Sequence, residues 1–155
     1  MIKIKATSFL SSDPHKPESR ALYHAVTPSG EEIIGYLVTV VQRTLFRGYK
    51  TKDYIRGRAT DRLHSFKPYT LALYTGVNDE NGKPICNGSF VHRWDSVTDR
   101  TIIGQIRYCT DIGAFIFESL PSRQTKFTHR DLMLQEETFI NNNKEITIHY
   151  KYTIV

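Results

Sequence analysis

The segment LYTGVNDENGKPICNGSFV, residues 73–91, is the clearest indicator of fold class in this chain. Hydrophobic and aromatic residues at its two ends suit short β-strands, and residues 79–82 (DENG) form a strong turn signal between them. The Asn-Gly pair supplies positive-φ positions at low cost, Gly76 and Gly88 permit sharp bends, and Pro84 sets the start of a strand. These features serve to close a small barrel of short strands. We therefore assign the segment an architectural role and not a ligand-binding one.

The composition of the whole chain is that of a β-rich globular protein. Its 155 residues suit one domain, and its hydrophobic content of 39% is near the globular average. Nine Tyr and eight Phe, together with many Ile, Thr and Val, favour strands over helices. We expect a mainly β fold with at most one or two short helices.

Strands are expected along most of the chain. Alternating or β-branched hydrophobic residues mark residues 1–10, 22–26, 33–41, 69–74, 85–94, 101–108, 114–118 and 145–155. Turn signals lie at residues 27–30, 110–113 and 141–143, and residues 11–19 are typical of a loop. Gly35 marks a bulge or a close approach of two backbones. Thr128 and Asp131 match a capping box, which predicts one short helix over residues 129–137.

Three segments of this pattern resemble the YopX family of phage and prophage proteins. Residues 30–38 (GEEIIGYLV) are similar to the family's opening element, GxWVYGYLV. Residues 74–91 are similar to its motif YTGLKDKNGKEIYEGDIV, and residues 103–108 with 113–116 resemble the hairpin that follows. The resemblance extends from about residue 30 to residue 118, in the family's order and with plausible spacing.

The resemblance implies a fold, and it names no activity. It implies an SH3-like barrel or pseudo-barrel in residues 69–155, within a single domain whose residues 1–68 form an N-terminal β part with a basic loop. No catalytic residues are established for the family, so none is transferred to this chain. Residues 87–89 (NGS) lack the family's acidic residues, and the family's usual ending has no counterpart in residues 146–155. The expected role is that of a phage accessory protein of unknown molecular function.

Positive charge is concentrated in residues 43–67. This segment holds eight Lys or Arg against two Asp, a net charge of +6, whereas the whole chain carries +5. It lacks clean periodicity and contains Gly48 and Gly57, so we expect strand edges and a long, mobile loop. Its cations alternate with aromatic residues, the mixture that neutralises phosphates and stacks bases. The candidate nucleic-acid contacts are Arg43, Arg47, Lys50, Lys52, Arg56, Arg58 and Arg62 for phosphates, and Tyr49 and Tyr54 for stacking.

Two other interpretations of this segment remain open. The charges can form a solvated surface that keeps the protein soluble, with the aromatic residues in the core. Alternatively, the chain is a protein-interaction or self-assembling module with no nucleic-acid affinity, which binds through exposed strand edges such as the apolar residues 33–41. The expected partners are therefore DNA or RNA, a phage or host protein, or a second copy of the chain.

No motif in the sequence predicts an active site. Residues 129–132 (HRDL) mimic a kinase catalytic loop, but Glu136 stands where the kinase pattern needs Asn. The six histidines show no metal-ligand spacing, and no local signature supports Cys86 and His92 as a nucleophilic pair. We predict a non-enzymatic binding module with no catalytic residues, no metal and no cofactor.

The expected location is the cytoplasm of a bacterial host cell. No segment approaches the roughly 18 apolar residues of a membrane helix, and residues 1–5 lack the apolar core of a signal peptide. Cys86 and Cys109 both fall in expected strands, where buried free thiols are common. We therefore expect no membrane partner and no disulfide.

Overall fold

The computed structural model describes residues 2–6, 21–46, 48–121 and 126–155 and shows a mainly β protein. It divides into two compact units, Met1–Tyr74 and Thr75–Val155, and it contains a curled, half-barrel sheet. Within the described ranges the only helical element is the 3-10 turn η2 (Pro68–Thr70). The predicted β-rich class is confirmed. The loop predicted over residues 11–19 lies outside the described residues.

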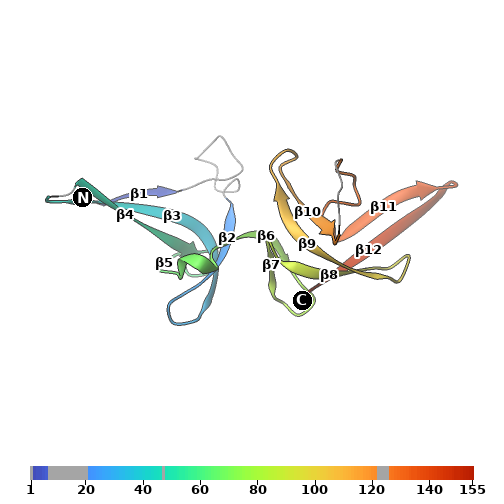
Figure 1. Cartoon of the computed structure of the whole chain (residues 1–155), viewed down its shortest axis with the longest axis horizontal. Helices are drawn as coiled ribbons and strands as arrows, with labels where there is room; N and C mark the ends of the chain where they lie inside the picture. The colour runs from blue at the N-terminus through green and yellow to red at the C-terminus, as the bar shows by residue number, and fades with distance from the viewer. Residues whose placement is uncertain (1, 7–20, 47, 122–125) are drawn as a thin grey trace. The chain divides into compact units, whose positions relative to one another are not determined.

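The first unit is an antiparallel sheet built around one long hairpin (Figure 1). Its strands are β1 (Ile2–Ala6), β2 (Leu22–Val26), β3 (Glu32–Thr44), β4 (Gly48–Gly57), β5 (Leu63–His64) and the first part of β6 (Ala72–Asn78). They follow the order β5-β4-β3-β2-β6, and β1 pairs with the second half of β3. The division between the two units falls within β6.

The described residues of the basic segment form strands joined by turns and no long loop, contrary to our expectation. Residues 48–57 form β4, which pairs with β3 from Thr44 opposite Gly48 to Gly35 opposite Gly57. The period-2 pattern was missed because most of this strand is solvated on both faces, so hydrophobic alternation is weak. Lysine and arginine are tolerated because β4 lies near the edge of the sheet, where their side chains reach water.

Residues 33–41 do not form an exposed edge, and this second expectation is also wrong. They lie inside β3, which pairs with β4 on one side and with β2 and then β1 on the other. Their β-branched residues suit a central strand that is paired along both of its edges. Gly35 makes the predicted close approach, since a Cβ atom built there would lie 2.0 Å from the carbonyl oxygen of Arg56.

The second unit is a five-stranded antiparallel sheet with its own core. Strands β8 (Phe90–Asp95), β9 (Thr101–Cys109), β10 (Ala114–Ser119), β11 (Glu136–Asn141) and β12 (Lys144–Ile154) follow the order β10-β9-β8-β12-β11. The buried core cluster consists of Ile85, Val91, Ile106, Phe117 and Tyr152. The hydroxyl of Tyr152 donates a hydrogen bond to the carbonyl oxygen of Leu134 at 2.8 Å, so the one polar atom of this ring is satisfied.

The turn at residues 79–82 forms as predicted and is held by a buried carboxylate. The Asp79 side chain accepts hydrogen bonds from the backbone N–H groups of Asn81, Lys83 and Ile154 at 2.8–3.1 Å. Burial raises the pKa of Asp79, but these hydrogen bonds outweigh it and the net pKa lies below its ordinary value. The turn is thereby tied to the last strand of the sheet.

The strand predicted over residues 85–94 is divided in two. β7 (Pro84–Cys86) and β8 are separated by a turn in which Gly88 has a φ of 91° and the N–H of Ser89 donates to the carbonyl of Cys86. The strand predicted over residues 69–74 starts later, at Ala72, because η2 precedes it. In both places a turn interrupts a hydrophobic run that sequence periodicity treats as continuous.

The helix predicted over residues 129–137 is absent. Half of the capping box forms, since the Asp131 carboxylate accepts hydrogen bonds from the N–H and the hydroxyl of Thr128. The chain then pairs with β10: Phe117 N–H donates to the Asp131 carbonyl, and Met133 N–H donates to the Phe115 carbonyl. Residues 136–141 form β11, so pairing with strand edges replaces the helical hydrogen bonds.

Candidate nucleic-acid interface

One face of β4 carries a row of cations. Because side chains alternate along a strand, Lys50, Lys52, Tyr54 and Arg56 lie on the same face. The ammonium of Lys52 lies 5.1 Å from the ring centroid of Tyr54 and 3.5 Å from the hydroxyl of Ser65. We call Lys50, Lys52, Tyr54 and Arg56 the basic face.

Arg56 anchors the inner end of the basic face. Its Nε lies 3.8 Å from an Asp61 carboxylate oxygen, and this buried Nε has no hydrogen-bond partner among the described atoms. The Asp61 side chain is 88% exposed, so the ion pair is weakened by solvent. The Asp61 carboxylate therefore neutralises the guanidinium only weakly.

The structure separates the other predicted contact residues from this row. Arg43 and Tyr49 face each other across the hairpin on the opposite face of the sheet. Arg58 and Arg62 follow β4 in the turn that leads to β5, and Arg47 lies outside the described residues. The sequence identified the charged segment but could not assign its members to faces, since it did not predict the strand.

The tip of the β3–β4 hairpin is apolar and solvent-exposed. Leu45 is 93% exposed, Phe46 is 95% exposed and Tyr49 is 72% exposed. Together with Thr44 and Lys50 they line a depression of about 530 Å³. Sequence reasoning included Tyr49 but overlooked Leu45 and Phe46 as contacts. The signal that could have found them is two large hydrophobic residues between cations at a turn.

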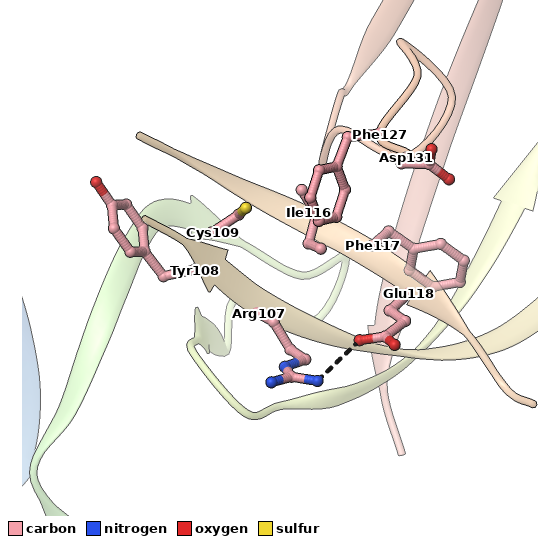
Figure 2. Close-up of a pocket in the computed structure, with 8 residues that line it drawn as sticks. All are labelled: Arg107, Tyr108, Cys109, Ile116, Phe117, Glu118, Phe127 and Asp131. Carbon is pink, nitrogen blue, oxygen red and sulfur yellow. Dashed lines mark hydrogen bonds and ion pairs between the residues drawn. The ribbon is translucent and has the colours of Figure 1, made fainter. Parts of the chain in front are cut away.

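A separate cavity of about 260 Å³ lies in the second unit, against β9 and β10 (Figure 2). Arg107 and Glu118 point toward each other at its wall and form an ion pair of 3.1 Å. Cys109, Phe127 and Asp131 also line it, and no histidine is among its lining residues. A nucleophile needs a neighbouring base to be activated, and this lining offers no Cys-His pair.

The described residues contain no group of three or more His, Cys, Asp or Glu side chains placed to hold a metal ion. Cys86 and Cys109 are buried, and neither forms a disulfide. In the same part of the chain, no helix has the length and apolar character to cross a membrane.

Comparison with known proteins found no protein similar to this chain. The sequence matches no family model, no curated protein and no solved structure. A row of cations beside an exposed aromatic tip can neutralise an anionic polymer and stack against flat groups.

Proposed function

We propose that this protein is a non-enzymatic binding module that contacts nucleic acid through the basic face of β4. The observation that carries the proposal is the placement of Lys50, Lys52 and Arg56 on one face of one strand. Alternate residues of a strand lie about 7 Å apart, so Lys50 and Lys52 are neighbours on this face, and Arg56 lies about twice as far beyond Lys52. The row therefore suits a phosphate backbone better than a compact anion.

The hairpin tip favours single-stranded over double-stranded nucleic acid. Exposed aromatic rings stack on unpaired bases, and each such contact contributes about 1–3 kcal/mol. Phe46 is the exposed ring at the turn itself, and Tyr54 lies within the basic face. Tyr49 is also exposed near the tip, on the opposite face of the hairpin. We expect phosphates to contact the strand and bases to contact the tip.

The biological setting is part of the same proposal. The likeness of residues 74–91 to the YopX motif supports a phage accessory protein that acts in the cytoplasm of its host. The curled, half-barrel sheet is compatible with an SH3-like barrel.

A protein-interaction or self-assembling module is the second candidate, and one observation favours it. β5 pairs only with Ile55 and Arg56, so among the described strands the outer edge of β4 from residue 48 to residue 54 has no partner. An open edge can accept a strand from another chain. Lys50 and Lys52 on that strand would repel a second copy of the same edge, which makes nucleic acid the better-supported partner.

The test is fluorescence anisotropy of a labelled oligothymidine and of a DNA duplex, with the full chain. If about three phosphates are contacted, affinity for the single strand should fall about 20-fold between about 50 and 200 mM salt. The double variant Lys50→Glu/Lys52→Glu should bind at least about tenfold more weakly. The matched control Lys126→Glu/Lys144→Glu reverses two exposed cations elsewhere and should bind like wild type.

Absence of binding at about 50 mM salt, or equal loss in both variants, would overturn the nucleic-acid proposal. A discrete oligomer in light scattering, without any nucleic-acid affinity, would instead support the second candidate.

A further inference from the structure

A positively charged groove, separate from the basic face, lies within the second unit. It has a volume of about 350 Å³, and its lining includes Arg93, Arg100 and Arg130 together with the apolar side chains Ile102, Phe139 and Tyr150. Small-molecule sites usually combine an apolar lining with a few convergent polar groups, and they begin at about 300 Å³. None of these residues belongs to the basic face of β4.

Arg93 is held in place before any ligand arrives. Its guanidinium carbon lies 4.1 Å from the ring centroid of Phe117 and 4.9 Å from that of Tyr150. One of its terminal nitrogens donates a hydrogen bond to the carbonyl oxygen of Arg130 at 3.1 Å. A guanidinium fixed in this way loses little side-chain entropy when it binds an anion.

The acidic residue of the groove is already engaged. Asp95 accepts hydrogen bonds from the N–H groups of Val97 and Thr98 and from the Thr98 hydroxyl. These hydrogen bonds hold the carboxylate against the turn that follows Asp95. Within the described residues, neither Arg100 nor Arg130 forms an ion pair, and both are exposed. A second carboxylate, Glu137, accepts a hydrogen bond from the Tyr150 hydroxyl at 3.1 Å. Three guanidinium groups therefore outnumber two carboxylates, and the groove attracts anions.

We propose that this groove binds the phosphate and base of a single nucleotide unit. The guanidinium groups of Arg93, Arg100 and Arg130 hold the phosphate, because a planar fork of N–H donors matches its oxygens. The base packs against the apolar lining beside Phe139 and Tyr150. The nucleotide comes either from a free nucleoside monophosphate or from a residue of a single strand. The inference does not rest on the proposed function of the basic face.

The test is an NMR titration of the full-length protein, with amide shifts as the readout. Adenosine 5′-monophosphate should shift the amide resonances of residues 93–100 and 130. Adenosine alone and inorganic phosphate alone should each bind at least about tenfold more weakly than the monophosphate. The variant Arg100→Ala/Arg130→Ala should lose the response, whereas Lys126→Ala/Lys144→Ala should keep it. Both arginines are exposed, so the amide spectrum of the variant should otherwise remain that of the folded chain.

A second arm distinguishes the two sources of the nucleotide. This arm uses the Lys50→Glu/Lys52→Glu variant. If a short oligothymidine shifts the same amides and the free monophosphate does not, the ligand is a nucleotide within a single strand. Shifts outside the groove, shifts unaffected by Arg100→Ala/Arg130→Ala, or no shifts with either probe at about 5 mM would overturn the inference. Because the wild-type shift map needs no variant, the result is decisive even if the double variant fails to fold.

Discussion

At the scale of single residues, the fold depends on a few positions where substitution would cause a clash or remove hydrogen bonds. Gly35 is one, because it lies in the central strand β3 directly against the backbone of β4. Asp79 is another, because its buried carboxylate satisfies three backbone donors at once. Both effects arise from close packing and hydrogen bonding, and neither depends on the charge of the basic segment.

Replacing Gly35 with Ala should destabilise the protein. The added Cβ would meet the Arg56 carbonyl oxygen at 2.0 Å and the Ile55 side chain at 2.9 Å, so β3 and β4 must separate. We expect the free energy of unfolding in urea to fall by about 2–3 kcal/mol. Thr51→Ala, at an exposed position of the same hairpin, is the control and should change it by less than about 0.5 kcal/mol. Equal effects of the two substitutions would contradict the close approach.

Asp79 should make stability depend on pH in the acid range. Its pKa is lowered in the folded state, so it stabilises the fold above the unfolded-state pKa of about 3.9, and this contribution is lost as pH falls through the folded-state pKa. We expect Asp79→Asn to be less stable at pH 7 by about 2 kcal/mol. The variant should also lose less stability than wild type between about pH 5 and pH 2. Parallel acid-denaturation curves for the two proteins would refute this role.

At the scale of secondary-structure elements, hairpins are the main structural unit. Figure 1 shows two long ones, β3–β4 and β11–β12. The strand at residues 144–154 was predicted almost to its ends, because alternation there is strong. The strand at residues 48–57 was not, because charged residues on both of its faces hide the same period.

The β11–β12 turn offers a stabilising substitution. Asn142 and Asn143 have φ values of 51° and 61°, and the flanking Asn141 and Lys144 are paired, which defines a two-residue turn of type I′. Glycine is favoured at the second position of this turn, since it has no Cβ to strain. We expect Asn143→Gly to raise the free energy of unfolding by about 0.5–1 kcal/mol and Asn143→Ala to lower it by about 1 kcal/mol. Thermal melts of the three proteins check this order, and the reverse order would contradict the assigned turn.

At the scale of the whole molecule, the chain consists of two units that share only strand β6 between them. The core cluster of Ile85, Val91, Ile106, Phe117 and Tyr152 lies wholly within Thr75–Val155. Burial raises the pKa of the Tyr152 hydroxyl to about 12, which reflects how fully this core excludes water. The second unit therefore has the elements of an independently folding domain.

A fragment of residues 75–155 should fold alone. Its sheet and core are complete without the first unit, so we expect dispersed amide resonances and a cooperative thermal transition. In ultraviolet titration, one tyrosine of the fragment should ionise only near pH 12, because Tyr152 stays buried. Between pH 10 and 12 this raised pKa should reduce stability, since only the unfolded chain then readily releases the proton. A collapsed spectrum would show that the first unit is required.

The sequence by itself determined the β-rich class, the turns at residues 27–30, 79–82 and 110–113, and the location of the positive charge. These features are local, because turn chemistry and composition act over a few neighbouring residues. Only the tertiary structure decided that residues 33–41 are central, that residues 129–137 form no helix, and which cations share a face. Strand pairing joins residues far apart in the chain, so the energies that select it are absent from any short window of sequence. The cationic groove around Arg93 arises in the same way, from three segments that meet only after folding.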